Sequence, residues 1–96
     1  MSFRVEYAPR SARDLARIRS YIVQESKSEA TADRFITRLL DDCEALHILP
    51  ERFPRYPFAP DWRMMPLGNY LVFFRIHEAA VRIGPIRHAA RQPFRG

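Results

Sequence analysis

The stretch SEATADRFITRLLDDCEALHILP, residues 28–50, decides the fold class of this chain. Its apolar side chains recur close to an i, i+3, i+4, i+7 pattern, the period of one face of an amphipathic helix. The positions that share this face are Ala32, Phe35, Ile36, Leu39, Cys43 and Leu46. Ser28 suits the N-cap, Glu29 suits the positive end of the helix dipole, and Pro50 cannot continue a helix. The stretch therefore predicts a helix over residues 29–49.

A second amphipathic helix, over residues 10–26, precedes this one. The positions that share its apolar face are Ala12, Leu15, Ile18 and Ile22. Two signals compete for its start: Pro9 suits the first helical position, and Ser11 with Asp14 three residues later resembles a capping box. Because only a short polar break separates the two helices, they are predicted to form an antiparallel hairpin.

The rest of the chain is typical of short strands joined by turns. Residues 50–60 hold four prolines and are predicted to be an ordered, extended connector. Before and after it the apolar residues alternate, and the predicted strands are residues 3–7, 62–65, 70–76 and 81–86. The third of these, YLVFFRI, is apolar on both faces, so we expect it to be central in the sheet. Pro85 removes a hydrogen-bond donor and predicts a bulge or a sheet edge.

The resulting order, β-α-α-β-β-β, predicts an α+β fold with the helix hairpin packed on one face of a small antiparallel sheet. The 96 residues argue for one domain, residues 1–96. The other face of the sheet is left for a partner or for chemistry. We expect the following residues to be largely buried: Leu15, Ile18, Ile22, Phe35, Leu39, Leu46, Val72 and Phe74.

Positive charge is concentrated at both ends of the chain. The formal net charge is +5, made up of +3 over residues 1–20, −3 over residues 21–50 and +5 over residues 51–96. Fifteen of the sixteen basic residues are arginine, which suits bidentate contacts with carboxylate or phosphate. Such a field steers association with polyanions or acidic proteins.

The residues that metal sites and nucleotide-binding loops need are few or scattered. The single cysteine, Cys43, excludes an internal disulfide and a multi-cysteine zinc site, and its helical spacing indicates a buried small hydrophobe. The histidines lack metal-ligand spacing, and the glycines form no phosphate-binding loop. These residues are His47, His77, His88, Gly68, Gly84 and Gly96. With no apolar leader and no run near the ~20 apolar residues of a membrane span, we expect a cytoplasmic protein without metal, small-molecule cofactor or membrane contact.

Four residues of the C-terminal third are candidates for a chemical site, because a small sheet brings distant residues together. They are Arg63, Arg75, His88 and Arg91. Arginines around a histidine could stabilise a phosphoryl transition state, while the histidine moves the proton of an RNA 2′-hydroxyl. In the alternative interpretation, which composition alone favours, Arg63 and Arg75 are solvated and His88 makes a hydrogen bond at a strand end.

Several short pieces of sequence occur in a characteristic order and spacing along nearly the whole chain. They are the opening strand, Ala12–Leu15, Ile18, Tyr21-Ile22, Leu46–Pro50, Arg63, Gly68–Tyr70 and Ile86–Arg91. Together they resemble the RelE/ParE superfamily of type II toxin–antitoxin toxins. The last piece, a histidine followed three residues later by arginine, is similar to the ending of the ParE branch.

This resemblance implies a compact toxin, associated with plasmid stabilization, that an antitoxin encoded beside it neutralises. ParE-like members poison DNA gyrase, whereas RelE-like members cut mRNA in the ribosomal A site. We expect a cognate acidic antitoxin to wrap the toxin in a hetero-oligomer. The residues expected to bind it are Arg10, Arg13, Arg17, Arg63, Tyr70, His88 and Arg91.

Missing side chains favour the ParE branch. RelE-like nucleases use basic residues, often lysines, with a tyrosine or a histidine-tyrosine pair near the C-terminus. Here the one lysine is Lys27, no tyrosine follows Tyr70, and Phe94 occupies the tail. One residue departs from the ParE pattern: Gln92 stands where ParE members usually carry an acidic residue. The leading interpretation is a non-enzymatic gyrase inhibitor. The alternatives are a ribosome-dependent endoribonuclease, which would use His88, Arg63, Arg75 and Arg91, and a degenerate member that binds antitoxin without being toxic.

Overall fold

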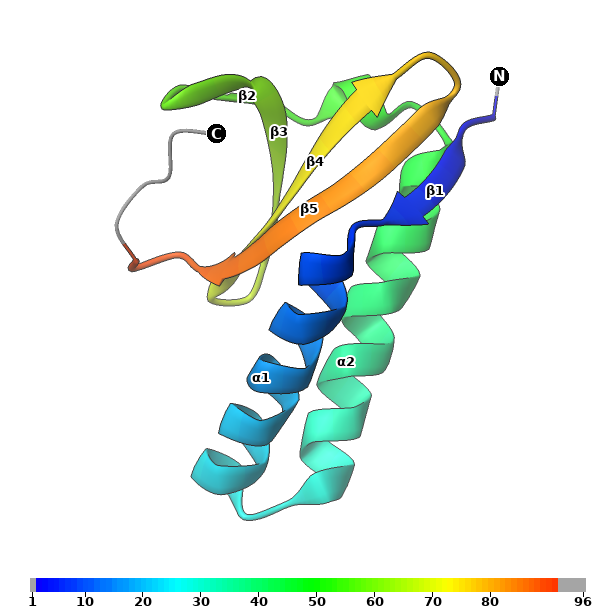
Figure 1. Cartoon of the computed structure of the whole chain (residues 1–96). Helices are drawn as coiled ribbons and strands as arrows, with labels where there is room; N and C mark the ends of the chain where they lie inside the picture. The colour runs from blue at the N-terminus through cyan, green and yellow to red at the C-terminus, as the bar shows by residue number, and fades with distance from the viewer. Residues whose placement is uncertain (1, 92–96) are drawn as a thin grey trace.

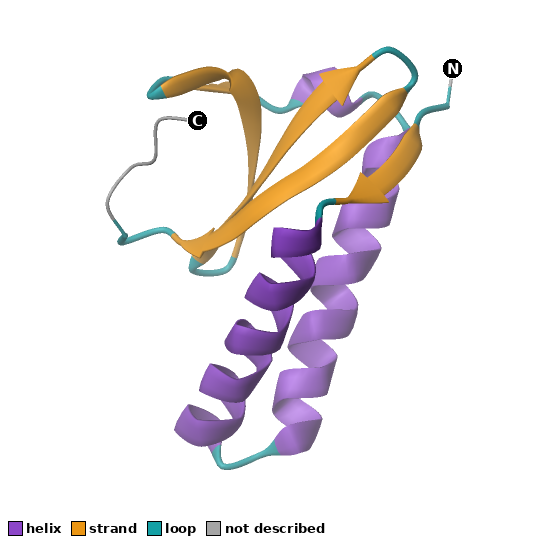
Figure 2. Ribbon diagram, viewed as in Figure 1, coloured by secondary structure: helices purple, strands orange, loops and turns teal. Residues whose placement is uncertain are grey.

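The structure, a computed structural model, describes residues 2–91. Figure 1 shows two antiparallel helices packed against one sheet. The elements are β1 (Arg4–Tyr7), α1 (Pro9–Ser26), α2 (Glu29–Glu44), the 3-10 helices η1 (Ala45–His47) and η2 (Pro50–Arg52), β2 (Arg55–Tyr56), β3 (Ala59–Leu67), β4 (Tyr70–His77) and β5 (Ala80–His88). The predicted α+β fold, with a helix hairpin on one face of a small sheet, is confirmed (Figure 2).

The start of α1 follows the proline signal. Pro9 is the first helical residue, and the preceding Ala8 caps the helix without a side-chain hydrogen bond. The predicted capping box of Ser11 and Asp14 does not form, because both side chains point into the protein and are buried. The Ser11 hydroxyl donates instead to the carbonyl of Ala8, at 2.6 Å.

The start of α2 is as predicted, but its end is not. The Ser28 hydroxyl accepts the N–H of Thr31 at 3.1 Å and caps the helix. The α-helix ends at Glu44 rather than near Leu49, and a 3-10 turn follows it. Leu49 itself has a left-handed φ of 49°. The residue before a proline avoids the α region, which explains why the helix cannot run up to Pro50.

The sheet has the strand order β1-β5-β4-β3-β2. The sheet was predicted to be antiparallel; it is mixed, because β1 pairs in parallel with β5, with Val5 opposite Val81. After β1, the helix hairpin leads the chain away from the sheet and back to it. The β3-β4-β5 meander then ends with β5 beside β1, and the two strands run in the same direction. The strand predicted to be central, β4, lies between β3 and β5.

A bulge interrupts β5 where Pro85 predicted a bulge or an edge. Val72 pairs with Ile86 and Phe74 with Ile83, so two residues of β5, Gly84 and Pro85, lie opposite one residue of β4. Gly84 is required here by space. A Cβ atom at this position would lie 2.1 Å from the ring of Trp62, so no side chain fits without moving the indole.

The main core lies between the helix hairpin and the sheet. Of the residues expected to be buried, five are at most 6% exposed: Ile18, Leu39, Leu46, Val72 and Phe74. The other three are half-buried at the margin of this core: Leu15, Ile22 and Phe35. Ala12, expected on the same face, is exposed. Cys43 is fully buried, and burial raises the pKa of its thiol to about 12, in agreement with the predicted buried hydrophobe.

The face of the sheet away from the helices is less open than predicted. The sheet bends at its β2–β3 edge (Figure 1), and Tyr56, Ala59 and Phe73 form a second buried cluster there. Trp62 packs against this cluster and over Gly84. Along residues 2–91, no helix is both long and apolar enough to cross a bilayer.

Candidate functional site

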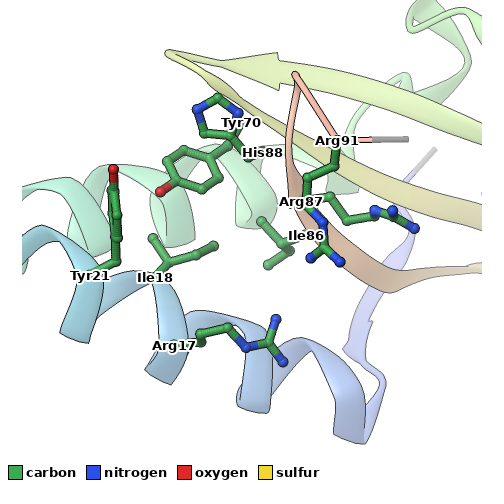
Figure 3. Close-up of a pocket in the computed structure, with 8 residues that line it drawn as sticks. All are labelled: Arg17, Ile18, Tyr21, Tyr70, Ile86, Arg87, His88 and Arg91. Carbon is green, nitrogen blue, oxygen red and sulfur yellow. The ribbon is translucent and has the colours of Figure 1, made fainter. Parts of the chain in front are cut away.

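A cleft separates α1 from the C-terminal end of β5. It holds a cavity of about 330 Å³, and its lining residues are drawn in Figure 3. They are Arg17, Ile18, Tyr21, Tyr70, Ile86, Arg87, His88 and Arg91. We call this feature the α1–β5 cleft. Its two tyrosines lie at one end and its three guanidinium groups at the other (Figure 3).

The floor of the cleft is apolar. Ile18 of α1 and Ile86 of β5 are 6% and 2% exposed and belong to the main core. The Tyr70 ring forms one wall, where it contacts Phe35 at 5.6 Å and His88 at 5.4 Å between ring centroids. Burial, followed by the electrostatic effect of the nearby Tyr21 hydroxyl, raises the pKa of Tyr70. This half of the cleft suits an apolar side chain.

The other half of the cleft is cationic. A second cavity of about 370 Å³ shares Arg17, Arg87 and Arg91 with the first and adds Arg10 and Asp14. Four arginines and one aspartate therefore line this cavity, and the net charge of the cluster is +3. Like charges gathered in this way raise the local potential and attract anions.

Asp14 connects α1 to β5. Its carboxylate is almost fully buried; Oδ2 accepts the N–H of Ile86 at 2.9 Å, and Oδ1 lies 3.2 Å from Nη1 of Arg17. β1 pairs with β5 only as far as Ile83, so the edge beyond it would leave the Ile86 N–H without an acceptor. The carboxylate supplies that acceptor.

Sequence alone suggested only a helix cap for Asp14. The signal that could have revealed its role is its spacing, since it lies four residues before Ile18 and so on the core face of α1. A carboxylate at such a position needs a buried partner, because burying a charge without one is costly. Tyr21, Ile86 and Arg87 belong to the pieces that resemble the toxin family, but nothing in the sequence predicted their place in the cleft.

His88 begins the turn that brings Arg91 to the cleft. Its Nδ1 accepts the N–H of Ala90 at 3.1 Å, and its carbonyl accepts the N–H of Arg91 at 3.1 Å. The N–H of Ala89 bonds the Asn69 carbonyl at 2.7 Å, which ties the turn to the β3–β4 connection. With Nδ1 acting as acceptor, the proton of the neutral imidazole resides on Nε2.

Comparison with protein families identifies the chain. Residues 5–93 match the family model described as "ParE toxin of type II toxin-antitoxin system, parDE". The chain belongs to this family. The toxin also resembles a solved chain described as "Chromosomal ParDE TA system from P. aeruginosa", with a TM-score of 0.81, over 91% of this chain and 96% of that one. At 17% identity this likeness shows the fold. No curated protein sequence matches the toxin.

Two of the four candidate nuclease residues of the toxin lie away from the cleft, on opposite faces of the sheet. The Arg63 guanidinium donates to the carbonyls of Glu51, at 3.2 Å, and Phe53, at 2.7 Å, and so fastens the connector to β3. Arg75 lies over the Trp62 ring, 4.4 Å from its centroid, on the face away from the helices. Neither lines either cavity of the cleft.

The other residues predicted to bind a partner also divide into those that line the cleft and those that do not. Those that the toxin brings together at the cleft are Arg10, Arg17, Tyr70, His88 and Arg91. Arg13 is exposed on α1 and lines neither cavity. Gln92 and Phe94 lie outside the described residues. Within residues 2–91, no group of three or more His, Cys, Asp or Glu side chains is arranged to hold a metal ion.

Proposed function

We propose that this ParE-family toxin acts by binding DNA gyrase and that a cognate acidic antitoxin neutralises it in a hetero-oligomer. The observation that carries the first part is the separation of the nuclease candidates. Arg63 and Arg75 are held at other places in the sheet, so the four residues of the expected nuclease site do not come together. The cations beside His88 and Arg91 are Arg17 and Arg87 instead.

The cleft also has few side chains that could take part in proton transfer. Cleavage of RNA needs one group to take the 2′-hydroxyl proton and another to protonate the leaving oxygen, each worth roughly 10²–10⁴-fold. Arginines remain protonated, and the Tyr70 hydroxyl carries its proton at neutral pH like that of any tyrosine, so neither can take the 2′-hydroxyl proton. Of the residues that line the cleft, this leaves His88 as the one candidate to take the 2′-hydroxyl proton. A binding mechanism requires no such pair.

The antitoxin part of the proposal rests on charge. The arginine cluster of the cleft carries a net charge of +3 in a chain of net charge +5. An acidic chain would neutralise this cluster and gain association rate from it. The family description names a toxin–antitoxin system, which supports an antitoxin as the partner.

Two assays on one preparation test the mechanism. Toxin purified free of antitoxin is added to a gyrase supercoiling assay and to a ribosome-dependent mRNA cleavage assay, with His88→Ala and Arg63→Ala in parallel. We expect inhibited supercoiling or trapped cleaved DNA, and no mRNA cleavage. Codon-specific mRNA cleavage that disappears in His88→Ala, with gyrase unaffected, would overturn the proposal.

The endoribonuclease remains the second candidate because the rings of Tyr70 and His88 are in edge-to-face contact beside the arginine cluster. A tyrosine and a histidine next to cations are the residue types that an RNA-cleaving site uses. Inactivity in both assays, with tight antitoxin binding, would identify the degenerate member instead.

A further inference from the structure

The α1–β5 cleft joins two different environments in a way that specifies a ligand. Its apolar cavity and its cationic cavity share Arg17, Arg87 and Arg91, so a ligand group in one lies directly beside the other. A ligand that fills both must carry an apolar group next to negative charge. Consecutive residues of a peptide provide this spacing.

We propose that the cleft binds an acidic peptide segment in which one apolar side chain, seated over Ile18 and Ile86, is followed directly by two carboxylates that pair with the arginine cluster. The assignment of this segment to the antitoxin rests on the proposed function. The cluster keeps a net charge of +3 after Asp14 is counted, and two carboxylates would offset two of these three charges. Arginine binds carboxylate through paired, geometrically matched hydrogen bonds, which gives such a contact its specificity.

The walls of the cleft favour a peptide over a nucleic acid. Base binding needs an open aromatic face on which the base can stack. Here the Tyr70 ring contacts both Phe35 and His88, and the floor beneath it is aliphatic. Tyr21, which is 54% exposed, offers a single open ring rather than the series on which successive bases stack. The guanidinium groups also gather at one end of the cleft (Figure 3), whereas a strand of nucleic acid needs cations spread along its backbone.

Asp14 tunes the site as well as supporting it. Its carboxylate offsets one charge of the cluster through Arg17, and it holds the β5 segment that forms the floor through the Ile86 N–H. Asp14→Asn removes the charge but keeps an amide oxygen for the Ile86 N–H. Because the cluster then carries one more unit of positive charge, the variant should bind an acidic ligand more tightly, and the gain should shrink as salt is added.

The test uses full-length toxin and three synthetic peptides, followed by NMR. The first peptide has a leucine followed by two glutamates between glycine and serine flanks; the second replaces the glutamates by glutamines, and the third replaces the leucine by serine. At concentrations up to about 1 mM, the first should give saturable shifts at the Ile18 and Ile86 methyl groups. The other two should bind at least about tenfold more weakly.

Two exposed arginines provide matched variants. Arg91→Gln should weaken the acidic peptide about tenfold and leave the glutamine peptide unchanged, since only the first has a carboxylate to pair with it. Arg38→Gln is the control, because Arg38 is exposed on α2 and lines neither cavity of the cleft. It should leave both peptides unaffected. Thermal unfolding checks that both variants are folded.

Three results would overturn the inference: equal binding of the acidic and glutamine peptides, no saturable shift at the cleft, or tighter binding of a short single-stranded DNA oligonucleotide to the same residues. The supercoiling assay, run on the same preparation, separates this inference from the proposed function. If the toxin inhibits gyrase but does not bind the acidic peptide, the peptide site alone is rejected. If the toxin binds the acidic peptide but does not inhibit gyrase, the gyrase mechanism alone is rejected.

Discussion

The two halves of β5 lie in different surroundings, although they belong to one strand. Its first half, residues 80–83, is paired with β1 on one side and β4 on the other, and Val81 and Ile83 are fully buried. Its second half, residues 85–88, is paired with β4, but its other edge faces α1 and is bonded by the carboxylate of Asp14. A side chain fills less space than a strand. The cleft therefore opens beside the second half, while the first half is closed core.

The largest loss of stability is expected in the first half of β5, which is closed core. Ile83→Ala removes a fully buried side chain and leaves a cavity that the paired strands on both sides cannot collapse to fill. We expect the free energy of unfolding to fall by about 2–5 kcal/mol. Urea denaturation followed by circular dichroism measures it. A loss far below that range would mean that β5 is packed no more tightly in its first half than beside the cleft.

The next effect breaks the bond that holds the second half. Asp14→Ala leaves the Ile86 N–H without its acceptor, and we expect a loss of about 1–3 kcal/mol. Asp14→Asn, which keeps an acceptor, should lose less. Hydrogen exchange is the more specific measurement, since the Ile86 amide should exchange faster in Asp14→Ala than in Asp14→Asn. Equal exchange rates in the two variants would show that the carboxylate does not support the strand.

A smaller effect is expected at the bulge that divides the two halves. In Gly84→Ala the new methyl group would lie 2.1 Å from the Trp62 ring, so the indole must move. Trp62 is only half-buried and can shift outward, so we expect a cost near the lower end of overpacking, about 1 kcal/mol. Tryptophan fluorescence should change together with stability. In a Trp62→Ala background the same substitution should cost nothing, and a cost that persists there would point to the backbone instead.

The smallest change in stability is expected at Arg91, beside the open half. Arg91→Ala removes an exposed side chain and should alter the free energy of unfolding by less than about 0.5 kcal/mol. Arg63→Ala should cost more, about 1 kcal/mol, because it loses two carbonyl contacts. The order should reverse in stopped-flow measurements of association with an acidic antitoxin, which Arg91→Ala should slow. Slower association in Arg63→Ala than in Arg91→Ala would place the antitoxin contact elsewhere.

Features that depend on residues close together in the chain could be predicted without the structure. The apolar period placed both helices, Ser28 marked the start of α2, and Pro9 was one of two competing signals for the start of α1. Pro85 marked the bulge. Each of these depends on residues within a turn or two of one another, where backbone geometry and side-chain spacing are enough to decide the outcome.

Only the tertiary structure decided which edges and side chains meet. The parallel pairing of β1 with β5 and the bond from Asp14 to Ile86, 72 residues apart, depend on where the helix hairpin returns the chain. The same folding places Arg63 and Arg75 on opposite faces of the sheet and gathers Arg17, Arg87 and Arg91 at one cleft. Periodicity tells which face of a strand a residue occupies, but it carries no information on which strand becomes its neighbour.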